Sequence, residues 1–188
     1  MPRPADRHRA AAQRFTACVE GVVSWDAATP VEGWTARDIV AHLVEWSRGL
    51  VESGSAARLP EGPDPRQDPS GAWHAHAAAL QALLDDPAAA ALPFDDRFLG
   101  RLRLDDAVDR FYTPDIVMHT WDLARGTGQD DRLDADECAA ILAAMEPFDD
   151  AMRATGQYGP RREPPAGAGP QELLLAFIGR DTGWRPPP

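Results

Sequence analysis

The sequence predicts an all-α protein: an antiparallel four-helix bundle with a short hairpin-like extended excursion and long loops. Four segments repeat apolar residues at the three- and four-residue spacing of an amphipathic helix. The segments between them are long and rich in Pro, Gly and Asp, as in bundles with crossover connections. A length of 188 residues suits a single domain, 1–188, with a sizeable core.

Each predicted helix carries a recurring apolar face. The helices are expected over residues 4–23, 35–51, 71–86, 105–126, 134–155 and 170–178. The faces of the first three carry Phe15, Val19 and Val22, then Ile39, Leu43 and Trp46, then Trp73, Ala77, Leu80 and Leu84. Thr35 is the expected N-cap of the second helix, with Asp38 three residues later completing a short capping box.

The connections have their own signatures. Residues 25–33 and 158–169 are Pro/Gly loops, and residues 53–70 contain almost nothing to bury. Residues 92–104 alternate weakly between apolar and polar, which favours a hairpin or an extended excursion. Pro114 interrupts the fourth helical region: either Thr113 caps a new helix there or the helix kinks. Gly126 and Gly128 end this region.

The most informative stretch is DIVMHTWDLARGTG, which places Asp115 and His119 four residues apart in an apolar, helix-like run. Positions i and i+4 share one helix face, where a carboxylate and an imidazole are costly to bury alone. A metal ion would satisfy both, and His42 in TARDIVAHLVEW is the third candidate ligand. Alternatives remain: His42 and His119 could be core histidines, and Asp115 could stabilise the helix dipole.

Such a set of two imidazoles and one carboxylate fits a divalent ion. Zinc is the default, and nickel and iron also fit. Three protein ligands leave positions open for water or substrate, which is typical of a catalytic rather than a structural site.

Other reactive side chains have simpler interpretations. Cys18 and Cys138 are expected to be buried small hydrophobes, while His8, His74 and His76 are expected at the surface. Asp122 could orient His119 or pair with Arg125 at the surface, and we favour a structural role for the Trp121–Asp122 pair. Trp46 and Trp121 are expected in the core.

Composition excludes several functions. The net charge of −11 argues against nucleic acid and against an anionic membrane surface. All basic residues are Arg, so Lys-based Schiff-base chemistry is excluded. The N-terminus lacks the apolar region of a secretory signal and no run approaches a membrane span, so a cytoplasmic location is expected.

The pairing of WTARDIVAHLVEW with DIVMHTWDLARGTG resembles the DinB/YfiT-like metal-binding superfamily. Within it the chain is similar to the branch that includes the N-terminal domain of mycothiol-dependent maleylpyruvate isomerase. The ending LLLAFIGRDTGWRPP resembles a C-terminal motif of related uncharacterised metal-binding proteins, so the resemblance covers roughly residues 15–184. It implies a helical bundle with metal ligands His42, Asp115 and His119. The branch typically has Glu at the position of Asp115, and a small inward shift of the helix near Pro114 would compensate for the shorter side chain.

The resemblance implies a metal-dependent enzyme that uses a low-molecular-weight thiol of the mycothiol type, as an S-transferase or isomerase acting on a small molecule. Arg48 or Arg101 would recognise an anionic group, and no catalytic residue is assigned. The alternative is a non-catalytic metal-binding or small-molecule-binding stress or sensor protein. A weaker third hypothesis is metal-assisted hydrolysis with Glu45 as the acid/base. A monomer and a homodimer are equally compatible with the sequence.

Overall fold

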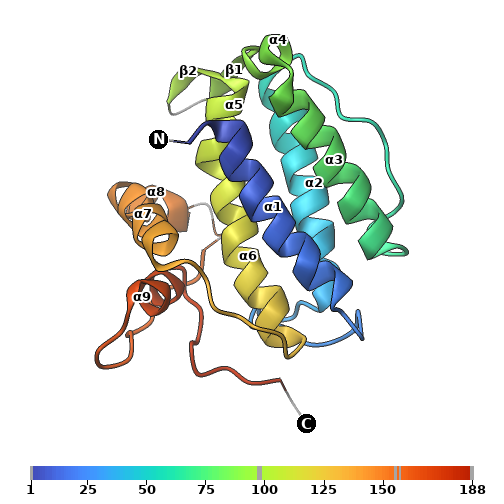
Figure 1. The fold of residues 1–188 in the computed structure, drawn as a ribbon. Coiled ribbons are helices and arrows are strands. Elements are labelled where there is room, and N and C mark those ends of the chain that lie inside the picture. Colours follow the sequence, from blue (N-terminus) through green and yellow to red (C-terminus); the bar gives the residue numbers. More distant parts are fainter. Residues whose placement is uncertain (1, 97–98, 155, 157, 187–188) are drawn as a thin grey trace.

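A computed structural model describes residues 2–96, 99–154, 156 and 158–186 of the chain. Within them the long helices that form a bundle are α1 (Pro4–Glu20), α2 (Ala36–Gly54), α3 (Pro69–Asp85) and α6 (Thr113–Gly126) (Figure 1). Helix α1 packs against α3 and α6, and α2 packs against the same two helices. The all-α bundle predicted from the amphipathic spacing is confirmed.

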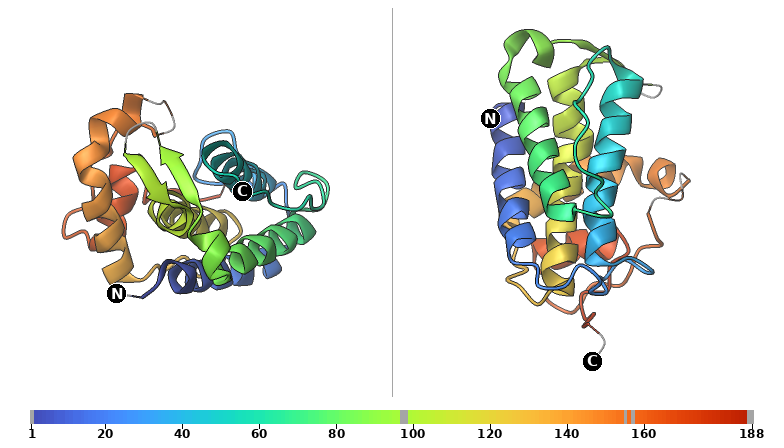
Figure 2. Two further views of the ribbon diagram at one scale, coloured as in Figure 1. Left: turned by 90° about the horizontal axis from the view of Figure 1, so that it is seen from above. Right: turned by 90° about the vertical axis from the view of Figure 1, so that its right-hand side faces the viewer.

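Each bundle helix has one parallel and one antiparallel neighbour. Helices α1 and α6 run in one direction, and α2 and α3 run in the other (Figures 1 and 2). Because α2 and α3 are adjacent and parallel, the connection over residues 55–68 returns along the length of the bundle. Arg48 of α2 holds this connection by donating to the carbonyl oxygens of Leu59 (2.7 Å) and Pro60 (2.6 Å). The side chains of Ala57 and Leu59 are buried, so the expectation that this segment buries almost nothing is wrong there.

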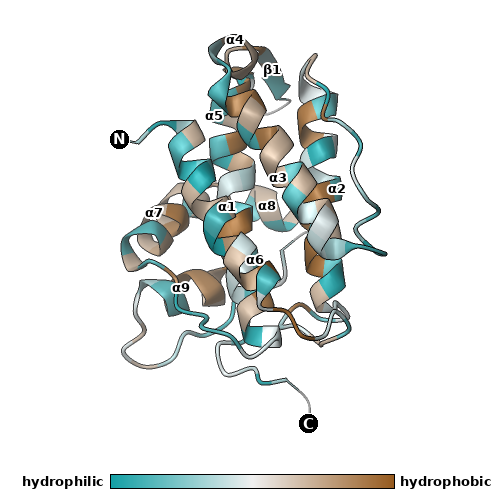
Figure 3. Cartoon of the chain, turned by 45° about the vertical axis from the view of Figure 1, so that its right-hand side comes forward, coloured by the Kyte–Doolittle hydropathy of each residue, from teal (hydrophilic) through white to brown (hydrophobic). Residues whose placement is uncertain are grey.

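Aromatic packing fills the centre of the bundle. The rings of Phe15 on α1 and Trp73 on α3 meet edge to face, 4.4 Å between centroids, and both are fully buried. The indole N–H of Trp73 donates to the hydroxyl of Thr16, so this large side chain is buried without an unpaired donor. Polar and apolar residues alternate around the bundle helices, as expected for helices with one face in a core (Figure 3).

A π-helical turn precedes α6. Helix α5 (Leu104–Ala107) continues through the turn η1 (Val108–Tyr112) into α6 without a break. The N–H of Thr113 donates to the carbonyl of Val108, five residues back. A proline inside a regular helix clashes with the carbonyl four residues earlier, and the wider π-turn accommodates Pro114 without ending the helix. The alternative in which Thr113 caps a new helix is wrong, because its buried hydroxyl makes no hydrogen bond.

The predicted excursion over residues 92–104 is confirmed as a hairpin. Strands β1 (Pro93–Asp96) and β2 (Gly100–Arg103) pair antiparallel, with Phe94 opposite Leu102. The short helix α4 (Pro87–Ala90) joins α3 to this hairpin. Phe94 is buried and lies over Gly54 at the end of α2, where a Cβ atom would meet its ring at 2.2 Å.

The remaining helices lie beside α1 and α6 (Figure 1). They are α7 (Ala135–Met145), the 3-10 turn η2 (Glu146–Phe148), α8 (Asp149–Ala154) and α9 (Pro170–Phe177). The prediction of one helix over 134–155 is wrong because Pro147 converts the middle to a 3-10 turn; its expected end, Thr155, lies outside the described residues. No helix in the described part of the chain is long and apolar enough to cross a membrane.

Candidate metal centre

Three predicted ligands lie together where α2 contacts α6. His42 extends from α2, and Asp115 and His119 extend from successive turns of α6. Nε2 of His42 is 3.0 Å from Oδ2 of Asp115, and Nε2 of His119 is 3.6 Å from Oδ1 of the same carboxylate. One donor atom from each of the three residues lies within 4.8 Å of the other two. Among the residues that the structure describes, no other group of His, Cys, Asp and Glu has this geometry.

The separation of these donor atoms suits a small divalent cation. Bonds of about 2.0–2.2 Å from Zn²⁺ to nitrogen and oxygen place tetrahedral ligand atoms roughly 3.3–3.6 Å apart. The separations of 3.0 and 3.6 Å lie just below this range and at its upper end. The Asp115 carboxylate directs one oxygen toward each imidazole, so a side chain of this length already reaches both histidines.

The cluster lies at the edge of the core, and its three side chains differ in exposure. The side chain of His42 is 27% exposed, whereas those of Asp115 and His119 are 13% and 7% exposed. A small molecule would therefore approach from the His42 side.

Two tryptophans pack against the candidate ligand histidines. The ring of Trp34 lies 5.1 Å from the ring of His42 and stacks on His119 at 5.9 Å. Trp46 stacks on His42 with 6.1 Å between the ring centroids. It was predicted in the core, and it packs against the core but is only half-buried. The sequence did not indicate a role for Trp34, although its position directly before the N-cap Thr35 brings it next to the first turn of α2.

A buried carboxylate holds the second histidine. Asp122 has no exposed surface, and its Oδ2 is 2.9 Å from Nδ1 of His119. Its two oxygens also accept from Nε and Nη2 of Arg180 at 2.8 and 2.9 Å. Burial acts to raise the pKa of Asp122, but the charge of Arg180 and the contact with His119 outweigh it and keep that pKa below its usual value. Asp122 therefore remains an anion inside the protein.

The alternative in which Asp122 pairs with Arg125 at the surface is wrong. Arg125 pairs instead with Asp131, 2.5 Å from Nε to Oδ2, and its guanidinium lies over the ring of Trp121. Trp121 is fully buried, as predicted. Arg101, one of the two arginines expected at the mouth of the site, is exposed on β2.

Two histidines expected at the surface are buried. His8 has no exposed surface and contacts Gln81 through Nδ1 (2.8 Å), and His76 is 4% exposed with Nε2 2.5 Å from the hydroxyl of Ser47. The ring centroid of each histidine lies 6.1 Å from that of Tyr112. Burial, with the nearby charge of Arg48 and the neighbouring His8, lowers the pKa of His76 to about 4. Only His74 matches the surface prediction, with its side chain 46% exposed beside Glu20.

The cysteines are buried and free, as predicted. Burial raises the pKa of the Cys138 thiol to about 11 and raises that of Cys18. Since the thiolate is the nucleophile, both thiols are inert at neutral pH.

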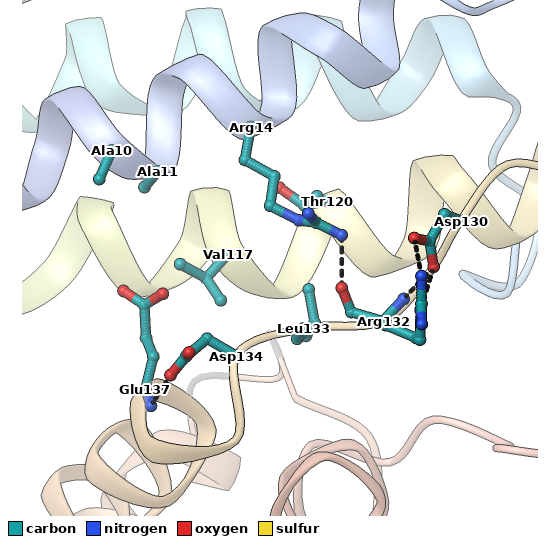
Figure 4. Close-up of a pocket in the computed structure, with 10 residues that line it drawn as sticks. All are labelled: Ala10, Ala11, Arg14, Val117, Thr120, Asp130, Arg132, Leu133, Asp134 and Glu137. Carbon is teal, nitrogen blue, oxygen red and sulfur yellow. Dashed lines mark hydrogen bonds and ion pairs between the residues drawn. The ribbon is translucent and has the colours of Figure 1, made fainter.

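A groove of about 490 Å³ lies on another face of α6 (Figure 4). It is bounded by α1, by residues 130–134 and by the start of α7, and Val117 of α6 lines it. Val117 is two positions from both Asp115 and His119, about 200° around the helix, so the groove is separate from the three ligands. Its arginines are engaged: Arg14 donates to the carbonyl of Arg132, and Arg132 pairs with Asp130 at 2.7 Å.

Residues 8–124 match the family described as the mycothiol maleylpyruvate isomerase N-terminal domain. Two uncharacterised proteins of Mycobacterium tuberculosis, from strains CDC 1551 and H37Rv, are each 29% identical to this chain. Each alignment covers 94% of this chain and 97% of the relative. No solved structure matches the chain at a significant level.

Proposed function

Because this chain belongs to the family of the mycothiol maleylpyruvate isomerase N-terminal domain, we propose that it binds a divalent metal ion, most simply zinc, through His42, Asp115 and His119. We further propose that it uses the ion in a reaction of a low-molecular-weight thiol of the mycothiol type, either S-transfer or isomerisation of a small electrophile. The observation that carries this proposal is the convergence of the three donor atoms within 4.8 Å.

The residues of the chain have separate tasks in this proposal. A divalent ion held there would lower the pKa of a bound thiol, so that the thiolate is present at neutral pH. Asp122 constrains the His119 ring through its 2.9 Å contact with Nδ1, a charge contact without hydrogen-bond alignment, and Nε2 lies on the side of Asp115. Trp34 and Trp46 pack against the candidate ligand histidines. In this proposal they shield the metal centre from water and offer flat apolar surfaces to the substrate.

The thiol in this proposal comes from a second molecule. Both cysteines of the chain are buried with raised thiol pKa values, so neither supplies the nucleophile. A reducing cytoplasm, where small thiols stay unoxidised, is the compartment that the proposal requires.

A non-catalytic metal-binding or sensor role is the second candidate. It is favoured by the lack of a free acid/base group among the described carboxylates nearest the ligands. Asp122 is bound by Arg180, and Glu45, considered above for hydrolysis, is exposed and lies 3.4 Å from Arg66. A metal-dependent hydrolase is therefore the weakest of the three hypotheses.

Metal analysis of the native protein, followed by chelation and titration with Zn²⁺, Ni²⁺ and Fe²⁺, tests the first part of the proposal. We expect one ion per chain. The second part is tested by consumption of a small thiol in the presence of varied electrophiles, before chelation, after it and after re-addition of metal. We expect activity only in the metal-loaded protein.

The outcomes separate the two candidates. Tight metal binding without any thiol consumption would favour the sensor role. Thiol transfer at an undiminished rate in metal-free protein would exclude the proposed use of the ion, and failure to bind any of the three metals would exclude both candidates.

A further inference from the structure

A buried ion pair beside the candidate metal centre joins two distant parts of the chain. Arg180 follows α9, whereas Asp122 lies on α6, 58 positions earlier. The guanidinium donates from two nitrogens to the two carboxylate oxygens, at 2.8 and 2.9 Å, and only 17% of the Arg180 side chain is exposed. Removing one partner from such a pair leaves an uncompensated buried charge, which is strongly unfavourable. Asp122 therefore depends on Arg180 for its position and its charge.

Asp122 transmits this constraint to a metal ligand. It occupies the position three residues after His119, on the same side of α6, and contacts Nδ1 of that ring at 2.9 Å. The two atoms are not aligned as a hydrogen bond, so the constraint on the ring comes from this close contact with the buried anion, while Nε2 of the same ring lies 3.6 Å from Asp115. A continuous series of contacts thus runs from Arg180 through Asp122 to the donor atom of His119.

The backbone after α9 is shaped to present Arg180. The N–H of Gly179 donates to Ala176 and the N–H of Arg180 donates to Leu175 (2.8 Å), which is the hydrogen-bond pattern of a Schellman turn. Gly179 has φ of 86°, and a Cβ atom there would lie 2.9 Å from the carbonyl of Pro160. Only glycine fits this turn, which reverses the chain and directs Arg180 back toward α6.

A second residue of the C-terminal part lies near the same centre. Tyr158 is packed against the core, and burial together with the negative charge of Asp115 raises the pKa of its hydroxyl. Burial acts to lower the pKa of Arg180, but the charge and hydrogen bonds of Asp122, with smaller contributions from Asp115 and Tyr158, outweigh it and raise that pKa. The segment over residues 158–180, of which the structure describes every residue, thus reaches the metal centre through Arg180 and packs against the core through Tyr158.

We propose that Arg180 is a positioning residue of the metal centre and that metal binding at His42, Asp115 and His119 is coupled to docking of the C-terminal segment, residues 158–186. This inference rests on the proposed metal site and extends it to a region outside the matched family domain, which ends at residue 124. Coupling between two equilibria is reciprocal. Loss of Arg180 weakens metal binding, and metal binding slows opening of the C-terminal segment.

Zinc affinity tests whether loss of Arg180 weakens metal binding. It is measured by competition with a chromophoric chelator in three variants: Arg180→Ala, Arg180→Lys and Arg185→Ala. Arg180→Ala is expected to weaken binding about 10- to 100-fold, the usual effect of removing the support behind a ligand. Arg180→Lys keeps the charge but loses the bidentate contact with Asp122. Its zinc affinity is expected to lie between those of Arg180→Ala and the wild-type protein. Arg185→Ala is the matched control with unchanged affinity, because among the described residues that guanidinium donates to the carbonyls of Gly183 and Trp184 and not to the metal centre.

Amide hydrogen exchange of the wild-type protein tests, without any substitution, whether metal binding slows opening of the C-terminal segment. Amides of residues 174–180 are expected to exchange more slowly with zinc than with chelator present, while those of α3 change little. If Arg180→Ala does not fold, the Arg180→Lys affinity and this exchange measurement decide the matter. Wild-type zinc affinity in Arg180→Lys together with unchanged exchange would overturn the inference while leaving the metal site intact. Absence of saturable zinc binding in the wild-type protein would overturn the metal site and this inference together.

Discussion

Replacing His119 with alanine is expected to lower zinc affinity by more than about 100-fold, since even residues that only support a ligand contribute 10- to 100-fold. His119 is the least exposed of the three candidate ligands, at 7%, and no other described imidazole lies close enough to replace it. The same substitution is expected to abolish any thiol reaction that depends on the ion. Isothermal titration of chelator-treated protein with Zn²⁺ measures the effect.

His74→Ala is the matched control, because His74 is exposed and lies 3.9 Å from the exposed carboxylate of Glu20. It is expected to bind zinc as the wild-type protein does. Asp115→Asn should weaken binding by replacing an anionic ligand with a neutral one, and Asp115→Glu should retain more affinity because it keeps the charge. Equal zinc affinity in the His119→Ala and His74→Ala proteins would contradict the assignment of the ligands.

The second large effect concerns pH. His76 is buried with a pKa lowered to about 4, while in the unfolded chain it titrates near 6.5. Between those values the unfolded state binds a proton that the folded state does not, so the free energy of unfolding decreases as the pH falls from about 6.5 toward 4. For a difference of about 2.5 pKa units the loss is about 3 kcal/mol. Burial also lowers the pKa of His8, which adds a loss of the same sign.

Urea unfolding at pH 7 and at pH 5, with chelator present, measures this dependence. We expect a shallower pH dependence in His76→Gln than in the wild-type protein, because glutamine can bond to Ser47 without titrating. His74→Ala, at an exposed position on the same helix, should retain the wild-type dependence. If the free energy of unfolding depends on pH identically in His76→Gln and the wild-type protein, the buried imidazole of His76 does not destabilise the folded protein at acid pH.

The bundle helices and the pairing of Asp115 with His119 were predictable because they depend on local periodicity, whereas the addition of His42, 73 positions from Asp115, was implied by the family resemblance. The spacing of Asp115 and His119 places them on one face of any helix, and the carboxylate of Asp38 accepts from the N–H of Thr35 as the capping pattern predicts. The hairpin followed from alternation about a short turn. Each of these features is determined within a few residues of sequence.

The incorrect predictions concern positions whose environment is set by distant segments. His8 precedes Phe15 by seven residues and His76 follows Trp73 by three, so the helical period could have placed both on buried faces. Their polar neighbours in the sequence obscured that signal. The partner of Asp122 could not be inferred in the same way, because Arg180 reaches it only after α9 has packed and the chain has reversed at Gly179.

The π-turn over Val108–Tyr112 has a consequence for how this segment can change in length. A π-turn uses about one residue more than an α-helix would over the same rotation, so it absorbs an insertion without altering the faces on either side. Loss of one residue there would restore a regular helix and leave His119 facing His42 only if Pro114 were also replaced, because that proline clashes with the carbonyl four residues earlier in a regular helix. Loss of one residue between Asp115 and His119 would rotate one ligand by about 100° relative to the other. In related chains, a change of length before Pro114 is therefore compatible with the set of three ligands. A change of length between Asp115 and His119 is not.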